Sequence, residues 1–236
     1  MLKVVPKHMV GDFVGVGSYT AKEAARLLKV RPRNVNRWLG GYNYKNNDQA
    51  ASSPPLWSPE ICSVSGKLEL SFRDLIELRF VSAFVDAGVG MKAIRNCMRY
   101  ARECVDDARP FSTLHFRTDG KTIFLESLQD SGDTLLLDLR RGQYVVKRVI
   151  EQTFRDLDIE QDAVVRWRPF QGKRSIIIDP DRAFGQPIIA SAGIPTIVLA
   201  DSFAAEGSIE AVSKLFEVPA AQVRDAVEFE KTLMAA

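Results

Sequence analysis

The segment Tyr19–Leu39, YTAKEAARLLKVRPRNVNRWL, limits most strictly what this chain can fold into. Thr20 followed by Glu23 is a capping box, in which the hydroxyl accepts from the third helical N–H and the carboxylate reaches back. Apolar residues recur at helical spacing up to Lys29. Pro32 suits the first turn of a second helix, because its missing N–H would have no intrahelical partner there. The segment therefore predicts two short helices joined by a tight turn, the helix-turn-helix layout.

The same segment is strongly basic. Between Ser18 and Leu39 there are six basic residues and one acidic residue, a net charge of +5. Basic side chains release counterions condensed on DNA, and Arg and Asn carry donors that fit base edges in the major groove. The side chains expected in the groove are Arg33, Asn34, Asn36 and Arg37, with Arg31 and Lys67 expected on phosphates. The alternative is a helical hairpin with a solvated basic face.

Length and charge indicate several domains with different partners. The chain has 236 residues, enough for more than one domain. Residues 1–110 carry a net charge of +6, residues 111–178 of +1 and residues 179–236 of −5. We expect an α+β protein divided at these points into a winged helix-turn-helix domain, a small central α+β module and a C-terminal three-helix domain of helix-turn-helix shape. Without a long apolar run or a signal-peptide pattern, a cytoplasmic protein is expected.

The remainder of the first domain predicts a wing and two more helices. Tyr42–Pro55 is rich in Gly, Asn, Ser and Pro and is expected to be a loop, with its tyrosines and Lys45 either near phosphates or simply exposed. Leu56-Trp57 and Lys67–Leu70 flank a turn-rich segment and predict the β-hairpin of a wing. Two helices follow, SFRDLIELRFVSAFVDAG and MKAIRNCMRYARECVDDA. With the motif TAKEAARLLKV…NVNRWL, residues 17–107 resemble the MerR-type winged-helix DNA-binding domain, which implies operator binding as a dimer.

Two features of the second of these helices have competing interpretations. Its basic stripe is either a solvated face or a set of phosphate contacts; the stripe consists of Lys92, Arg95, Arg99 and Arg102. Cys97 and Cys104 lie seven residues apart and share a face, so they either sense metal or oxidant or are small buried hydrophobes. The third cysteine, Cys62, is distant, and an odd number without a CxxC motif does not indicate a disulfide framework or a metal site.

The central module is predicted to mix strands and one helix. Thr113–Phe116 and Thr122–Leu125 flank Thr118-Asp119-Gly120-Lys121, a hairpin signal. The further predicted strands are Thr134–Leu139, Ala163–Trp167 and Ser175–Ile178, and Gln143–Phe154 is predicted to be helical. His115 is expected on a half-buried strand. No glycine-rich loop follows a strand, so no nucleotide cofactor is expected. Because the chain has no CxxC motif and no clustered His, no metal is expected either.

The last part of the chain combines paired turns with three predicted helices. The turns contain Ile178-Asp179-Pro180, Gly185-x-Pro187-x-Ile189 and Ile194-Pro195, and the helices run from Pro195 to Ala205, from Ser208 to Phe216 and from Pro219 to about Leu233. Residues 176–233 resemble a short family of unknown function found in bacterial antitoxins, although the arginine that usually precedes Ile-Pro is absent. The resemblance implies a type II toxin–antitoxin system whose usual toxin is a PIN-like ribonuclease.

The two segments of helix-turn-helix shape differ in their charge. The last helix carries Asp225, Glu228 and Glu230, which would be repelled by phosphates, so this end is expected to bind protein. Its apolar residues are either core or interface; they are Val223, Ala226, Val227 and Phe229. The expected function is that of a DNA-binding antitoxin that binds double-stranded DNA and a PIN-like toxin.

Three other functions remain open at this point. One is a MerR-like transcriptional regulator without a toxin, which senses a small molecule or protein. A second is an adaptor that makes protein contacts only. An enzyme is disfavoured, because no carboxylate cluster, His pair or nucleophile arrangement stands out.

Overall fold

The computed structural model describes residues 15–46, 49–61, 67–130 and 139–234. Its helices are α1 (Ala21–Leu28), α2 (Pro32–Gly40), α3 (Phe72–Asp86), α4 (Met91–Val105), α5 (Leu114–Asp130), α6 (Leu139–Phe154), α7 (Thr196–Glu206), α8 (Ile209–Phe216) and α9 (Ala220–Met234). Its strands are β1 (Tyr19–Thr20), β2 (Tyr42–Asn46), β3 (Gln49–Ser53), β4 (Glu69–Leu70), β5 (Leu157–Glu160), β6 (Ala163–Trp167), β7 (Ile176–Ile178) and β8 (Pro187–Ile189). The α+β fold class is confirmed.

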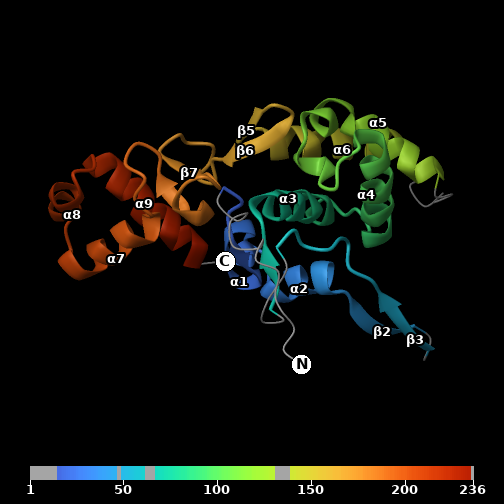
Figure 1. Cartoon of the computed structure of the whole chain (residues 1–236), viewed down its shortest axis with the longest axis horizontal. Helices are drawn as coiled ribbons and strands as arrows, with labels where there is room; N and C mark the ends of the chain where they lie inside the picture. Colours follow the sequence, from blue (N-terminus) through green and yellow to red (C-terminus); the bar gives the residue numbers. More distant parts are fainter. Residues whose placement is uncertain (1–14, 47–48, 62–66, 131–138, 235–236) are drawn as a thin grey trace, which may run out of the picture.

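The molecule is elongated, with helices at both ends and in the middle. Figure 1 shows α7–α9 at one end, α4–α6 at the other, and α1 and α2 below the middle. The end of α9 returns to the middle and lies beside α1. Among the helices of the described residues, none is long and apolar enough to cross a membrane.

The predicted helix-turn-helix is present, and local chemistry explains its boundaries. The Glu23 backbone N–H donates to Thr20 Oγ1 at 3.3 Å, and the Thr20 N–H donates to Glu23 Oε2 at 2.7 Å, which completes the capping box at the start of α1. Lys29 adopts a left-handed conformation, φ 56°, and ends that helix. Pro32 then occupies the first turn of α2, as its sequence position predicts.

The wing prediction was wrong in position. The segment expected to be a loop contains an antiparallel β2–β3 hairpin, whose pairs run from Tyr42↔Ser53 to Asn46↔Gln49. The expected hairpin is absent from the described residues between positions 56 and 70: Trp57 is buried, and β4 pairs with β1 at the start of α1. The Gly, Asn and Ser content favoured a loop, but the alternating tyrosines of β2 are strand formers, and cross-strand pairing overrode composition.

Phenylalanines from three α-helices and one 3-10 turn form the core of the helical group around α3. Phe80 of α3 packs on Phe154 at 4.8 Å between ring centroids, and Phe84 stacks on Phe124 at 5.5 Å. Phe111, in the short 3-10 turn Pro110–Ser112, and Phe116 of α5 fill the space beside them. The side chains of all six are nearly inaccessible to solvent, so α3 is the central element of this group.

The hairpin predicted at residues 113–125 was wrong: α5 runs through it without a break. The Asp119-Gly120 pair misled because it is a common turn signal. In α5, however, Gly120 allows close helix packing, since a Cβ there would meet Ile150 Cδ1 at 3.0 Å and Phe116 Cε1 at 3.1 Å. His115 accordingly lies on a helix, exposed and 3.5 Å from Asp119, rather than on a strand.

Four antiparallel strands connect the central segment to the C-terminal helices. They have the order β5-β6-β7-β8, and they include the predicted strands at 163–167 and 176–178. Ile176 and Ile177 of β7 pair with Ile189 and Ile188 of β8, so the expected domain boundary at residue 178 falls inside one sheet. The helix predicted at Gln143–Phe154 and the three C-terminal helices are confirmed. The strand predicted at Thr134–Leu139 falls outside the described residues, apart from Leu139, which begins α6.

A buried carboxylate in α3 makes stability depend on pH. Glu77 is fully buried and accepts from the Ser112 N–H at 2.8 Å and the Phe111 N–H at 3.3 Å. Burial raises its pKa from the ordinary value of 4.5 to about 8, against the opposing effects of these hydrogen bonds and of Arg109. The folded protein therefore keeps a proton that the unfolded chain releases between these pH values, so Glu77 makes the fold less stable as pH rises through that window.

We expect the Glu77→Gln variant to lose this pH dependence, because its amide is always neutral and its carbonyl still accepts from the Ser112 N–H. The free energy of unfolding of the wild type should fall between pH 5 and pH 8 relative to that of the variant, with a slope of up to about 1.4 kcal/mol per pH unit. Urea unfolding across this range measures the difference. Parallel pH profiles for the two proteins would show that Glu77 keeps no proton in the fold.

Candidate nucleic-acid interface

Helix α2 presents the predicted DNA-binding residues on its outer side. Its apolar side is buried by Val35, Trp38 and Leu39. The predicted residues lie outside this seam: Arg31, Arg33 and Asn36 are exposed, and Asn34 and Arg37 are half-buried. Arg31 is the N-cap residue and has no side-chain capping bond, so the N-terminal turn is open to solvent. In helix-turn-helix proteins this turn of the second helix contacts base edges.

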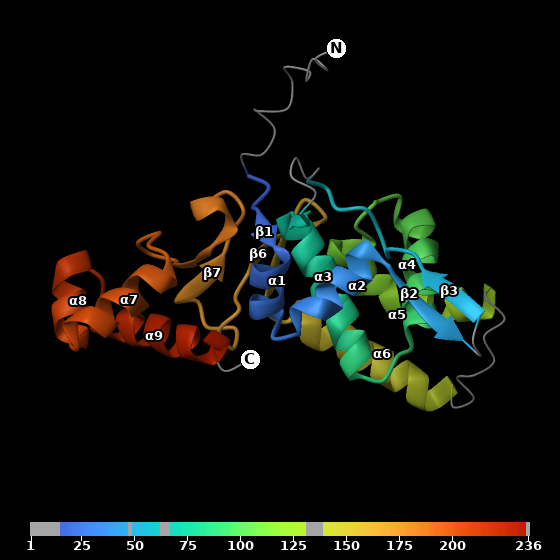
Figure 2. The ribbon, with the colours of Figure 1, turned by 90° about the horizontal axis from the view of Figure 1, so that it is seen from below.

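The β2–β3 hairpin extends the surface of α2 (Figure 2). The Arg37 guanidinium lies 3.9 Å from the Tyr42 ring centroid, and Tyr42 contacts Tyr44 at 5.7 Å between centroids. Gly41 makes the junction, with φ +69° and a Cβ position only 2.7 Å from Ser53 O, which no other residue fits without displacement. Asn43, Tyr44 and Lys45 are exposed along β2. Helix and hairpin thus form one continuous polar and basic surface.

Two arginines of helix α4 bind the chain at the end of this hairpin. Arg95 donates to the carbonyls of Pro54 and Pro55, each at 2.9 Å, and to Ser53 Oγ at 3.1 Å. Arg102 donates to the Leu56 carbonyl at 3.4 Å. The predicted alternatives for this basic stripe were a solvated face and phosphate contacts, whereas these two arginines bind the chain that follows β3. The sequence carries no signal for these hydrogen bonds, because the arginines donate to backbone carbonyls that are distant in the chain.

Lys67 occupies a different place from that expected. It is exposed just before β4, whose Glu69 pairs with Thr20 at the start of α1. It is therefore not on the β2–β3 hairpin, and the expected wing placement is corrected.

The C-terminal end packs against the helix-turn-helix, a contact for which the sequence carries no signal. Arg26 of α1 forms an ion pair with Glu230 of α9, and Glu230 also accepts from Thr196 Oγ1 at 2.5 Å. Tyr19 donates its hydroxyl proton to the Gly185 carbonyl at 2.7 Å. A Cβ at Gly185, φ +79°, would lie 2.2 Å from that hydroxyl oxygen, so the contact requires glycine. The predicted DNA-facing and protein-facing ends therefore share an interface.

The C-terminal helices leave apolar surface uncovered. On α9 the four apolar residues left open between core and interface are all buried, namely Val223, Ala226, Val227 and Phe229. Helix α7 differs, because only Thr196 and Leu199 are buried in a helix that is mostly apolar. Val198 of α7 is 39% exposed and Leu215 of α8 is 64% exposed.

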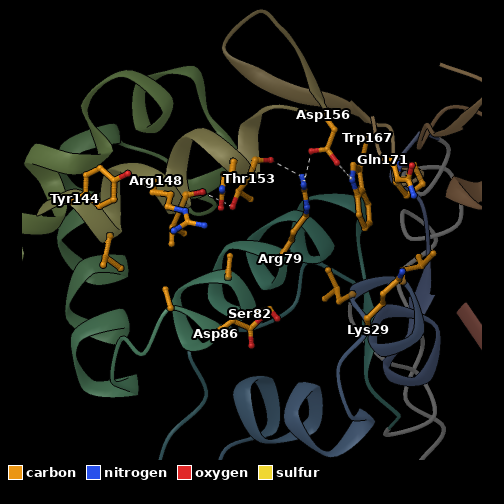
Figure 3. Close-up of a pocket in the computed structure, with 18 residues that line it drawn as sticks. Lys29, Arg79, Ser82, Asp86, Tyr144, Arg148, Thr153, Asp156, Trp167 and Gln171 are labelled. Carbon is orange, nitrogen blue, oxygen red and sulfur yellow. Dashed lines mark hydrogen bonds and ion pairs between the residues drawn. The ribbon is translucent and has the colours of Figure 1, made fainter. Parts of the chain in front are cut away.

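A cavity of about 770 Å³ separates the helix-turn-helix from α6 (Figure 3). Its wall includes Arg79, which donates to Asp156 Oδ1 at 2.5 Å and to the Thr153 carbonyl at 2.7 Å. Trp167 Nε1 donates to the same carboxylate at 3.1 Å. Lys29, the residue that ends α1, lines the side of the cavity away from Tyr144 and Arg148 of α6, as Figure 3 shows. A ligand in this cavity would lie against the turn that positions α2.

The described cysteines do not form a paired site. Cys97 is fully buried, and burial raises the pKa of its thiol, which disfavours the reactive thiolate. Cys104 is exposed. In the ranges that the structure describes, no group of three His, Cys, Asp or Glu side chains is placed to hold a metal ion. For Cys97 the buried-hydrophobe interpretation fits.

Comparison with known proteins finds a family match in the C-terminal region, a similar sequence and a similar solved structure. Residues 176–229 match DUF433, a family of proteins of unknown function, which confirms the resemblance indicated by the Asp-Pro and Ile-Pro motifs. The chain is 26% identical over 222 residues to a Mycobacterium tuberculosis protein named as a candidate antitoxin, VapB45, covering 89% of this chain and 92% of the relative. The crystal structure of Rv2018 from the same organism has a TM-score of 0.68 at 21% identity, covers 89% of this chain and 96% of that one, and shows a shared fold.

Proposed function

We propose that this protein is the DNA-binding antitoxin of a type II toxin–antitoxin system. It acts in the cytoplasm without catalysing a reaction, and binds its operator as a homodimer through a MerR-like winged helix. Its C-terminal half neutralises a PIN-like ribonuclease toxin. The similarity to the candidate antitoxin VapB45 runs over nearly the whole of both chains and supports this assignment.

The observation that carries DNA binding is the continuous surface of α2 and the β2–β3 hairpin. Arg33, Asn34 and Asn36 are proposed to read base edges from the outer side of α2. Arg37, stacked on Tyr42, links this helix to the hairpin as well as reaching toward the groove. Arg31 and Lys67 are proposed to contact phosphates, which makes binding weaker at high salt.

We assign one role to each proposed domain, although the β5–β8 sheet is shared between the last two. Residues 1–110 would bind DNA, residues 111–178 would form the connecting module, and residues 179–236 would bind the toxin. Because β8 pairs with β7 across residue 178, deleting the last domain would remove a strand from the sheet. Point variants on exposed residues therefore separate the two activities more cleanly than truncation.

Isolation of the tagged full-length protein from its own cell tests the proposal directly. We expect the bound DNA to be enriched in the promoter of the protein's own operon, and the bound protein to be a ribonuclease encoded beside it. Recovery of a ribonuclease without promoter DNA would reject operator binding. Promoter DNA without any ribonuclease would reject the antitoxin role.

The uncovered apolar surface supplies a sharper test of toxin binding. Val198→Asp and Leu215→Asp, made separately, should each reduce ribonuclease recovery by about 30-fold if the residue lies in the centre of the interface. Operator binding should stay unchanged in both. Leu114→Asp is the matched control, because Leu114 is 40% exposed but lies on α5. Undiminished recovery by both C-terminal variants would place the toxin elsewhere.

The cavity in Figure 3 favours a second candidate, a regulator that senses a small molecule. Its volume is in the range of ligand pockets, and it borders Lys29 at the turn before α2. Under this alternative, a small molecule extracted with the protein would change its operator affinity, and no ribonuclease would accompany it. Isolation from the native cell distinguishes the two functions.

A further inference from the structure

Four arginines surround a cavity of about 440 Å³ on the face of the β5–β8 sheet away from the core. The lining consists of Asp158, Arg166, Arg168, Arg174, Ile177, Arg182 and Ala190. Strand alternation explains the arrangement. Trp167 pairs with Ile178 and both are buried in the core, so Arg166 and Arg168 on either side of Trp167 lie on the opposite face.

The carboxylates beside these arginines neutralise only part of their charge. Asp158 pairs with Arg166 at 3.6 Å and with Arg168 at 3.1 Å, and Asp179 pairs with Arg166 at 3.2 Å. Arg182 instead donates to the neutral carbonyl of Ala190 at 3.0 Å. Four guanidinium groups against two carboxylates leave a local charge of +2.

Two further observations point to a missing acceptor. Within the described part of the chain, exposed Arg174 forms no ion pair, and the Nε–H of Arg168 is buried without a hydrogen-bond partner. Buried donors of this kind are normally satisfied by protein, water or a bound ion. Arginine donors are geometrically suited to planar carboxylates and to phosphates.

We propose that this arginine pocket binds a phosphate monoester. A monoester carries a charge between about −1.5 and −2 at pH 7, which matches the local charge of +2, whereas a single carboxylate carries only −1. The cavity is large enough for the phosphate and part of the group that bears it. The phosphate comes either from a small phosphorylated molecule or from the 5′ end of a nucleic acid strand. The pocket is separate from the α2 surface.

Calorimetric titration of the full-length protein tests this site. A nucleoside 5′-monophosphate should bind, and the unphosphorylated nucleoside should not. Binding should weaken as pH falls below about 6, where the phosphate loses one negative charge. Equal binding of nucleoside and nucleotide, or equally strong competition by an Asp- and Glu-rich peptide, would overturn the proposal.

Variants locate the site within the molecule. Arg174→Ala should weaken nucleotide binding about tenfold or more, because one charge-assisted hydrogen bond is lost. Arg168→Lys keeps the charge but removes the planar donor fork, and should weaken binding as well. Arg224→Ala is the matched control, since Arg224 is an exposed arginine on α9 outside the pocket. Wild-type affinity in Arg174→Ala and Arg168→Lys, with an unchanged melting temperature, would refute the site.

A separate binding experiment identifies the molecule that carries the phosphate. Single-stranded oligonucleotides with a 5′-phosphate or a 5′-hydroxyl are compared in an Arg33→Ala/Asn36→Ala background, which removes the proposed α2 contacts. A preference for the 5′-phosphate supports a strand end, and nucleotide binding without that preference supports a small molecule. If neither the nucleoside 5′-monophosphate nor the 5′-phosphorylated oligonucleotide binds, the phosphate site is refuted. Operator binding by α2 is measured separately, so the two proposals fail independently.

Discussion

Replacing both Arg33 and Asn36 by alanine is expected to lower operator affinity by about 100-fold, because each replacement removes hydrogen bonds to base edges. Both residues are exposed on α2 and neither supports the core, so the protein should remain folded. Specificity should fall with affinity, so the ratio of operator to random-DNA binding should shrink. Electrophoretic mobility shift or fluorescence anisotropy at one fixed salt concentration measures both quantities.

The control for this variant is Arg117→Ala, which removes the same guanidinium group from an exposed position on α5. Its operator affinity should stay within about twofold of wild type. Arg37→Ala is less suitable as a first test, because it also removes the stacking contact between Arg37 and Tyr42 of the hairpin. Wild-type affinity and specificity in the Arg33 and Asn36 double variant would contradict the assignment of α2 as the reading helix.

Replacing Asp74 by alanine is expected to destabilise the protein by about 4 kcal/mol, because it leaves the nearly buried charge of Arg109 unpaired. Asp74 accepts from Arg109 Nε at 2.6 Å and from Trp57 Nε1 at 2.8 Å. It also accepts from the Glu60 N–H at 2.9 Å and the Ser71 N–H at 3.2 Å. One carboxylate therefore fixes the start of α3 to the segment that follows the hairpin.

Urea unfolding of three variants checks this expectation. Asp74→Asn should be less damaging than Asp74→Ala, because its carbonyl still accepts some of these bonds while the negative charge is lost. Asp201→Ala removes an exposed carboxylate on α7 and should change the free energy of unfolding by less than about 0.5 kcal/mol. A loss in Asp74→Ala no larger than in Asp201→Ala would show that the Arg109 charge is satisfied without Asp74.

The hairpin and α5 show why composition misled where it did. Tyr42–Pro55 has the residues of a loop, and Asp119-Gly120 has the residues of a turn. In both places the decisive partner lies outside the local pattern: the adjacent strand β3 and the distant Arg95 for the hairpin, and the distant Ile150 of α6 for Gly120. Pairing and close packing with such partners override local preference.

The sequence by itself determined the elements whose signals lie within one or two helical turns. The capping box at Thr20 and Glu23, Pro32 at the start of α2, and Pro195 and Pro219 at the starts of C-terminal helices are such signals. They were sufficient to predict the helix-turn-helix and the side of α2 that carries Arg33 and Asn36. The contact of these residues with DNA stays a prediction.

Only the tertiary structure decided which charges meet. Nothing near Arg26 in sequence indicates Glu230, and nothing near Arg168 indicates Arg182 across the cavity. Ion pairs between side chains that are distant in sequence form only when the whole chain folds. Their free energy depends on how deeply the charges are buried, which no local sequence pattern encodes. The interface between the two ends and the arginine pocket therefore became visible only in three dimensions.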